Sequence, residues 1–466
     1  MHESARSNDS LSIVGKIPTS LVISWNNRSL IEESLRNRAL EAVQVVAARL
    51  RDPQRVVDIA RIAEKQSTLF LQWNDASLAC GFSSTALLYL FLAQSNPEQG
   101  WETIAQQHLR LAAEGTHRQP FFSPALFGGS SGLASLVSLF YHHESRYQKT
   151  YQTLNTRLAQ QVINARWRRE DFQGVAFADY DVISGAAGIL GYLVTIDQPD
   201  ETVHDAIQIL LEYLIWMAGS DPTEEHRRWF IHPELHAIPS HRDTYPEGYF
   251  DCGLAHGIAG PLAALAAASL AGYYLPGQRE AMLSLSQWIL DHRLQDRWGI
   301  NWPAGIPRAA SFSAEQYSQL HPSRAGWCYG SPGMARALWL AGVVLNEATI
   351  QNVAVEAVES FLRRPKAALN IDSVSFCHGV SGLLSICLRF AHETESPLIL
   401  QHIPLLVQQI LDDFNPDLPL GFRDLELANN AVDDPGLLTG AVGIALSLLS
   451  VSTSIEPAWH RLFLIT

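Results

Sequence analysis

Residues 323–333 read Ser-Arg-Ala-Gly-Trp-Cys-Tyr-Gly-Ser-Pro-Gly, and residues 376–382 read Phe-Cys-His-Gly-Val-Ser-Gly. In both stretches a cysteine stands two residues before a Gly-x-x-Gly tetrad that opens an apolar run. Cys328, Cys377 and His378 have the residue types of a zinc site with three protein ligands, which leaves a fourth position open for chemistry. The two cysteines are 49 residues apart, so the site depends on a fold that brings both stretches together.

The Gly-x-x-Gly tetrad recurs along the whole chain, and each copy opens a run rich in alanine and leucine. The copies begin at Gly81, Gly129, Gly185, Gly257, Gly330, Gly379 and Gly440. In the first copy Ser84 replaces the second glycine, which puts the close packing of that helix in doubt. Successive copies are 48 to 73 residues apart, which leaves room for two helices and their connections. We predict an all-α fold, an α/α toroid (α/α barrel) of seven helical hairpins, whose glycine-opened helices form the inner ring with their N-terminal ends at one mouth.

The bulk composition fits one large domain. The chain has 466 residues, 47% hydrophobic and 17% charged, which is ample for a buried core. Because a ring cannot be cut without exposing its inner faces, we predict a single domain over residues 1–466. Residues 29–51 carry apolar side chains at helical spacing and are expected to form an outer helix. Residues 220–252 are polar, aromatic and interrupted by proline, which indicates an insertion on the ring with room for short strands.

Charge and apolar patterning exclude several classes of protein. The net charge of −14 argues against nucleic-acid binding, because little here would neutralise phosphates. Residues 1–20 lack the apolar core of a secretory signal, and the longest apolar stretches, 261–275 and 437–449, are shorter than a bilayer requires. Five cysteines, an odd number, are typical of the reducing cytoplasm and of thiols used for chemistry or metal binding. We therefore expect a cytoplasmic protein.

The predicted ligand set favours thiol transfer over hydrolysis. The thiolate, not the thiol, is the nucleophile, and coordination to zinc generates it at neutral pH. Two thiolate ligands already balance the charge of the ion, so a third thiolate, from a substrate, would stay electron-rich enough to attack. Hydrolases that activate water more often use histidine and carboxylate ligands. His256 and His378 each stand one residue before a tetrad, so these equivalent positions are expected to meet at one mouth.

Four motifs in this order resemble those of the lanthipeptide cyclases (lanthionine synthetase C, LanC-like), and the resemblance covers nearly the whole chain. The motifs are Tyr180-Asp181-Val182-Ile183-Ser184-Gly185, Gly253-Leu254-Ala255-His256-Gly257, Arg324 through Gly330, and Cys377-His378-Gly379. The resemblance implies an α/α toroid with a central zinc ion, whose ligands fall on Cys328, Cys377 and His378. It places the other residues of the pocket at Asp181, His256, Arg324 and Tyr329.

The resemblance also implies a function. Members of this family add cysteine thiols of a dehydrated, leader-bearing ribosomal precursor peptide to dehydroalanine or dehydrobutyrine. This Michael-type addition closes the lanthionine and methyllanthionine thioether rings of lantibiotics. The resemblance implies that a dehydratase and an exporter of the same pathway are partners. It also implies that the protein is attached to the inner face of the membrane through these partners. Because no dehydratase domain precedes the ring, we expect the standalone class I type of cyclase.

His256 is the candidate for the acid that protonates the α-carbon after thiolate attack, because a histidine suits proton transfer near neutral pH. The alternative is that His256 is a fourth zinc ligand that closes the site. Asp181 is expected either to orient this imidazole or to pair with Arg324. Arg324 could also steady the enolate oxygen that forms during the attack.

Two other functions stay open on the sequence alone. A LanC-like protein of the eukaryotic sort would use the same site to add glutathione to dehydroamino acids in proteins. An α/α-toroid glycoside hydrolase would need two carboxylates at the mouth, and Asp181 has no visible partner in the repeats. The remaining candidate residues are expected to be structural: Cys80, Cys252 and Cys387, and the histidines of a solvated loop, His226, His232, His236 and His241.

Overall fold

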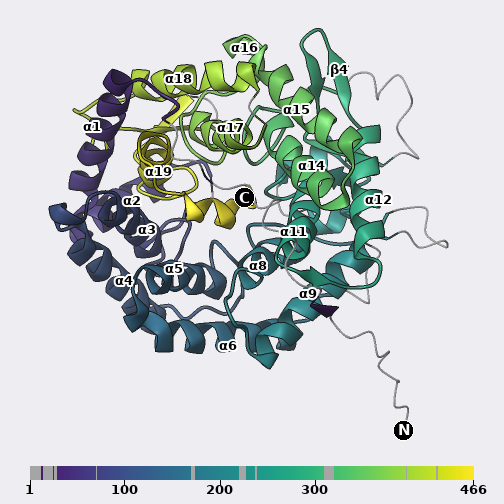
Figure 1. The fold of residues 1–466 in the computed structure, drawn as a ribbon, viewed down its shortest axis with the longest axis horizontal. Helices are drawn as coiled ribbons and strands as arrows, with labels where there is room; N and C mark the ends of the chain where they lie inside the picture. Colours follow the sequence, from purple (N-terminus) through teal and green to yellow (C-terminus); the bar gives the residue numbers. More distant parts are fainter. Residues whose placement is uncertain are drawn as a thin grey trace.

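The structure is a computed structural model that describes residues 12–13, 25, 29–69, 71–168, 174–219, 227–236, 239–308, 320–394, 396–426 and 429–466. Its helices form two concentric circles around a common centre (Figure 1). Each inner helix begins within a tetrad: α3 (Phe82–Ser95), α5 (Ser130–His143), α8 (Ala186–Leu193), α11 (Ala259–Leu270), α14 (Ser331–Leu345), α17 (Val380–Thr394) and α19 (Ala441–Ser452). The predicted α/α toroid with a glycine-opened inner ring is therefore confirmed.

The outer helices pack against the inner helices that precede them in the chain. They are α4 (Trp101–Arg118), α6 (Gln148–Asn164), α9 (Glu201–Ala218), α12 (Gln278–Asp291), α15 (Ala348–Leu362) and α18 (Pro397–Asp412). The last inner helix, α19, packs instead against α1 (Glu33–Leu50), the amphipathic helix expected within residues 29–51. Helix α2 (Pro53–Gln66) leads from α1 toward the first tetrad. Six hairpins are thus continuous in sequence, whereas the seventh pair joins the two ends of the chain and closes the ring.

The second glycine of a tetrad lets the preceding turn pass close to the helix. A β-carbon on Gly382 would lie 2.0 Å from the carbonyl oxygen of Phe376, far inside van der Waals contact. In the first tetrad Ser84 takes this place, and its buried hydroxyl donates a hydrogen bond to the carbonyl oxygen of Gly81 (2.7 Å). Helix α3 still packs against α4, α5 and α19, so the serine does not open the ring.

The turns before the seven inner helices are joined by a closed circle of backbone hydrogen bonds, which we call the belt. In every turn the residue two positions before the first glycine accepts a hydrogen bond from an N–H of a neighbouring turn. The bonds run from Leu78 to Phe127, Phe127 to Ile183, Val182 to Ala255, Leu254 to Cys328, Cys328 to Cys377, Cys377 to Leu438, and Leu437 to Ala79. The belt satisfies backbone groups that would otherwise be buried unpaired, and it sets equivalent side chains side by side.

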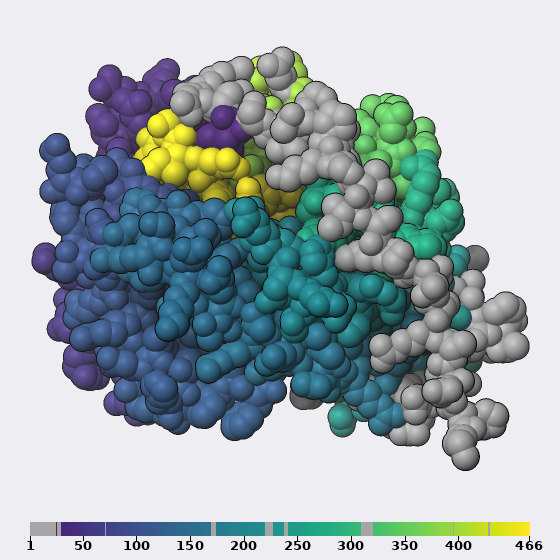
Figure 2. Space-filling view, turned by 60° about the horizontal axis from the view of Figure 1, so that its bottom comes forward, coloured from purple at the N-terminus to yellow at the C-terminus, as the bar shows by residue number. Residues whose placement is uncertain are grey.

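The C-terminal segment fills the centre of the ring, where the short 3₁₀-helix η6 (Ala458–Phe463) lies inside the inner circle (Figure 1). This end of the chain, yellow in Figure 2, is seen behind the blue rim formed by the earlier repeats. Phe463 is fully buried against Trp327 and Phe376, with ring centroids 5.0 Å and 3.9 Å away. Trp327 also donates an indole N–H to the carbonyl oxygen of Phe463 (2.9 Å). Because these two aromatic residues directly precede Cys328 and Cys377, the C-terminal segment supports the turns that carry both thiols.

Short antiparallel strand pairs lie in the connections between helices. They are β1 (Ser12–Ile13) with β3 (Tyr273–Tyr274), β2 (Tyr249–Asp251) with β6 (Gly305–Pro307), β4 (Leu294–Asp296) with β5 (Gly299–Asn301), and β7 (Asp424–Glu426) with β8 (Asn430–Val432). Several connections also contain one-turn helices: α7 (Phe177–Tyr180), α16 (Lys366–Leu369), η1 (Pro97–Gln99) and η2 (Ser145–Tyr147).

The segment 220–252 contains β2, η3 (Pro233–Leu235) and α10 (Pro239–Thr244), so short strand structure does occur there. Residues 220–226 and 237–238 lie outside the described residues, as does most of the stretch 1–20 that was expected to lack a signal. The single domain and the insertion on it remain predictions. In the part of the chain that the structure describes, no helix is long and apolar enough to cross a membrane.

Candidate active site

The thiols of Cys328 and Cys377 lie next to each other on the belt. The N–H of Cys328 donates to the carbonyl oxygen of Cys377 (3.0 Å), which places the same position of two adjacent repeats side by side. A hydrogen bond between the two sulfur groups lowers the pKa of Cys328 and raises the pKa of Cys377. The belt therefore places two thiols in contact, and this contact favours the thiolate form of Cys328.

His378 turns one ring nitrogen toward a buried carboxylate. Its Nε2 lies 3.1 Å from Oδ1 of Asp424, a residue of β7 that is only 2% exposed. Among the described residues its Nδ1 has no hydrogen-bond partner. Burial lowers the pKa of His378, but the hydrogen bond and charge of Asp424 outweigh this effect, and the net shift of the pKa is upward.

His256 makes the opposite choice of nitrogen. Its Nδ1 lies 2.6 Å from Oδ2 of Asp181, which is fully buried, while the His256 side chain keeps 27% of its surface exposed. Burial lowers the pKa of His256. The hydrogen bond and the charge of Asp181 raise this pKa by a larger amount, so the net shift of the pKa is upward. The other oxygen of Asp181 accepts the N–H groups of Ser184 (2.7 Å) and Gly185 (2.8 Å), which fixes the turn that leads into α8.

Tyr329 is held by a third buried carboxylate. Its hydroxyl donates to Oδ2 of Asp251 (2.8 Å), and the hydroxyl of Tyr249 donates to the same oxygen at 3.4 Å. Asp251 also accepts the N–H of Gly253 (2.8 Å) and is 1% exposed. Burial raises the pKa of Asp251 to about 6, against the lowering effect of its hydrogen bonds. Gly253 leaves room for the ring, because a β-carbon there would lie 2.9 Å from Cε1 of Tyr329.

Arg324 supplies positive charge to this group without an ion-pair partner among the described residues. Its charge favours ionisation of both Cys328 and Cys377 and disfavours protonation of His378. Of the two roles expected for Asp181, the structure therefore shows the contact with His256 and not a pair with Arg324.

The structure thus brings the expected residues to one part of the belt, but it does not assemble a finished metal cluster. Within the described ranges, no three His, Cys, Asp or Glu side chains are drawn together closely enough to hold a metal ion. What is present is a thiol pair and a nearby imidazole whose Nδ1 is not used by another residue of the described chain. Zinc ligation by Cys328, Cys377 and His378 therefore stays a prediction.

Residues outside this group have structural surroundings. Cys80 is buried with its sulfur 3.6 Å from Asp434, and Cys252 and Cys387 are also buried. His241 hydrogen-bonds Tyr249 (2.9 Å), His236 is buried beside the same tyrosine, and His226 lies outside the described residues.

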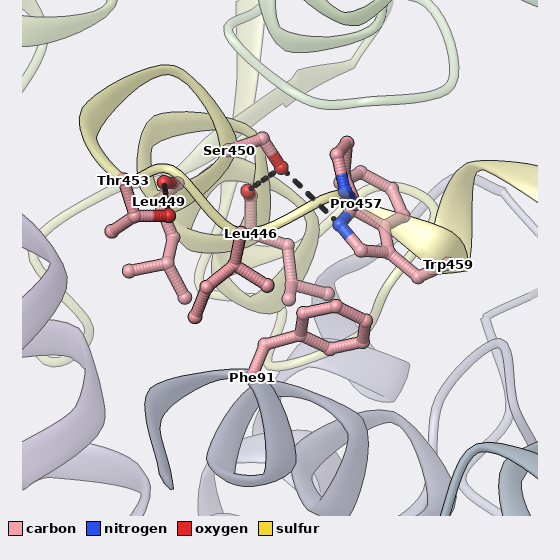
Figure 3. A pocket seen from close by; sticks show the side chains of 8 residues that line it. Phe91, Leu446, Leu449, Ser450, Thr453, Pro457 and Trp459 are labelled. Carbon is pink, nitrogen blue, oxygen red and sulfur yellow. Dashed lines mark hydrogen bonds between the residues drawn. The ribbon is translucent and has the colours of Figure 1, made fainter. Parts of the chain in front are cut away.

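A cavity beside the chain end is a packing gap of about 10 Å³ (Figure 3). In it the hydroxyl of Ser450 donates to the carbonyl oxygen of Leu446 (2.7 Å) and accepts the indole N–H of Trp459 (3.2 Å). The cavity is lined by Phe91, Leu446, Leu449, Ser450, Thr453, Ile455, Pro457 and Trp459.

Two of the three carboxylates behind the site were missed by the sequence analysis. Asp251 stands six residues before the first glycine of its tetrad, as do Asp75 and Asp434, so an acid at this position was a signal within the repeat. Asp424 has no such signal, because it comes from the connection between two repeats. Only the path of β7 brings it to His378.

Comparison with known proteins agrees with this fold. Residues 72–464 match the family described as lanthionine synthetase C-like protein. The "Nisin biosynthesis protein NisC" of Lactococcus lactis subsp. lactis is 25% identical over 362 residues, which are 76% of this chain and 83% of that protein. A solved structure named "Nisin cyclase" is 22% identical, with a TM-score of 0.70 over 89% of this chain and 97% of that chain. The structural likeness shows a common ring architecture.

Proposed function

This chain belongs to the lanthionine synthetase C-like family, and we propose that it is a cyclase that closes thioether rings in a dehydrated ribosomal precursor peptide. The reaction would join the sulfur of a peptide cysteine to the β-carbon of dehydroalanine or dehydrobutyrine, which gives lanthionine or methyllanthionine. One arrangement carries the proposal: a pair of adjacent thiols and a histidine–aspartate pair occupy turns of the same belt. The similarity to a protein named for nisin biosynthesis supports it.

The donor set fits zinc. Cys328 and Cys377 offer two soft sulfur ligands, and His378 keeps Nδ1 for a metal while Nε2 faces Asp424. We propose that these three residues hold one zinc ion per chain. When bound, the ion would supply the chemistry that the reaction needs, a substrate thiol held as thiolate at neutral pH.

His256 is proposed to provide the proton. Attack of the thiolate on the β-carbon moves the π electrons toward the α-carbon and its carbonyl oxygen, and the α-carbon then takes up one proton. This proton balances the one that the thiol lost, so the product is an isomer of the substrate. Asp181 holds Nδ1 of His256, which leaves Nε2 to donate and stabilises the protonated ring.

The other residues are proposed to stabilise and orient. Arg324 has no ion-pair partner among the described residues and would steady the negative charge on the enolate oxygen. Tyr329, fixed by Asp251, would line the pocket beside His256, with ring centroids 6.5 Å apart. Asp181 is buried against His256 and is not open to a sugar, so the geometry gives no support to a glycoside hydrolase.

The ring also restricts how a peptide reaches the site. The C-terminal segment occupies the centre, so the peptide would approach from the mouth that carries the belt. One site must serve every ring of a peptide, so the core peptide would have to slide while its leader stays bound, which raises the effective concentration of each thiol. A dehydratase that prepares the peptide, an exporter, and a cytoplasmic location with contact to the membrane through these partners complete the proposal.

The test is cyclisation of a dehydrated, leader-bearing peptide by the purified protein. Each ring removes one free thiol without changing the mass, so alkylation followed by mass spectrometry should show one reagent adduct fewer per ring. Wild-type protein should remove the thiols, and a sample treated with a chelator should not. If the peptide thiols stay free while glutathione is added to dehydroamino acids of a protein substrate, the glutathione function replaces the cyclase.

A further inference from the structure

We propose that Asp424 is a positioning residue of the metal site, and that the β7–β8 pair delivers it there to fix the ring of His378. The proposal rests on the proposed zinc ion, but it concerns a residue that lies outside the repeats and outside the motifs. It explains why a carboxylate from the connection between the sixth and seventh repeats enters the protein interior.

The contact determines which nitrogen of His378 can bind a metal. An ionised carboxylate can only accept, so the bond of 3.1 Å to Asp424 requires a proton on Nε2 of His378. In a neutral imidazole the other nitrogen, Nδ1, then carries the lone pair. A histidine that binds a metal commonly has its second nitrogen held in this way, which fixes the tautomer and makes the ligand more basic.

Asp424 is itself held in place from two sides. It pairs with Val432 in the β7–β8 register, and its Oδ1 accepts the hydroxyl of Ser373 at 2.5 Å. Ser373 stands six residues before Gly379 in the turn that carries His378, so the carboxylate is locked to the same turn as the ligand. This arrangement ties the orientation of the imidazole to the belt.

The backbone N–H of Ser375 in this turn is paired without Asp424. In that turn Ser373 already accepts the N–H of Ser375 (2.9 Å), the hydrogen bond that Asp251 and Asp434 make with the backbone of their own turns. Among the described residues no Lys or Arg forms an ion pair with Asp424. A buried carboxylate is costly unless hydrogen bonds compensate it, and those of Asp424 come from Ser373 and His378.

The experiment measures zinc affinity, by chelator competition at fixed pH, in wild type and in the variants Asp424→Ala, Asp424→Asn and Asp433→Asn. Loss of the outer carboxylate is expected to weaken zinc binding by about 10- to 100-fold in Asp424→Ala. The amide oxygen of Asn can still accept from Nε2, so Asp424→Asn should lie between this value and wild type. Asp433 is on the neighbouring stretch but pairs with Arg423 (3.1 Å), so Asp433→Asn should bind zinc like wild type.

The outcomes separate this proposal from the proposed function. A wild-type protein without zinc would overturn the metal itself, whereas zinc in wild type with equal affinity in Asp424→Ala would overturn only the role of Asp424. Circular dichroism with the metal removed checks that the variants fold. If Asp424→Ala does not fold, the zinc affinity of Asp424→Asn tests the proposal instead. A zinc affinity of Asp424→Asn within about twofold of wild type would then overturn the proposal. A changed visible spectrum of the cobalt-substituted Asp424→Asn protein would further support altered ligand geometry.

Discussion

The two histidine–aspartate pairs of the belt use the same side chains in opposite ways. His256 gives Nδ1 to Asp181 and keeps Nε2, whereas His378 gives Nε2 to Asp424 and keeps Nδ1. Both histidines stand one residue before a tetrad, so the repeat alone would make them equivalent. The difference shows that the carboxylate partner, not the position in the repeat, selects which nitrogen each ring presents.

The two carboxylates also differ in what else they do. Asp181 belongs to the turn it supports and accepts two backbone N–H groups there, so it holds the turn before α8 and orients His256 at once. Asp424 comes from β7 and accepts the hydroxyl of Ser373. Ser373 lies in the turn before α17, where it already accepts the backbone N–H of Ser375. Removing Asp181 should therefore affect folding and chemistry together, whereas removing Asp424 should affect the metal site more selectively.

The largest expected effect comes from removing one thiol of the pair that lies beside both histidines. Cys377→Ala should lose its zinc and all ring formation, because the two ligands that remain are too few to hold the ion. Most of the helical circular dichroism should remain, since the core consists of apolar inner helices. Metal analysis and the thiol-alkylation assay measure both effects. Stoichiometric zinc in this variant would contradict the ligand assignment.

Replacement of His256 tests whether the two histidines have different roles. His256→Asn should keep full zinc content and bind the peptide, but form rings at least about 100-fold more slowly, as expected for loss of a general acid. Zinc content and single-turnover rates are measured on the same preparation. Loss of zinc would show that His256 is a fourth ligand, and a wild-type rate would remove it from the mechanism.

A comparison of Asp181→Ala with Asp424→Ala tests the difference between the two carboxylates. Asp181→Ala leaves the N–H groups of Ser184 and Gly185 and the ring of His256 unpaired, which should lower the free energy of unfolding by about 1–3 kcal/mol. In the metal-free proteins Asp424→Ala should lower the free energy of unfolding by less, because the N–H of Ser375 in the turn before α17 stays paired with Ser373. Urea unfolding measures both values. Equal losses would show that the two pairs are alike in structural importance.

Stability should also depend on pH, through a buried carboxylate without a histidine partner. Burial raises the pKa of Asp434 to about 6, against the lowering effect of its hydrogen bonds with Thr439 and Gly436. The folded state then keeps the proton to a higher pH than the unfolded state, so this group lowers stability as pH rises from about 4 to about 6.

The difference in unfolding free energy between wild type and Asp434→Asn should therefore change across this window, by at most about 1.4 kcal/mol per pH unit, and stay level above it. Urea unfolding at several pH values measures it. A constant difference would show that folding does not raise the pKa of Asp434.

The sequence by itself determined the inner ring and the residues that meet at its mouth. The tetrads repeat at intervals of two helices. The second glycine of a tetrad is needed because the preceding turn passes close to the helix at that position, as Gly382 shows. The positions one and two residues before the tetrad carry His256, His378, Cys328 and Cys377, so their gathering follows from the repeat. These are local properties, and local patterns can be read along a chain.

Only the tertiary structure decided how the ring closes and how its site is oriented. Helix α1 pairs with α19, the C-terminal segment fills the centre, and Leu437 bonds back to Ala79 across most of the chain. Asp424 reaches His378 from a connection whose length and path follow no period. Such contacts join residues that are distant in sequence, and the choice between Nδ1 and Nε2 depends on which carboxylate the packed connections place beside each ring.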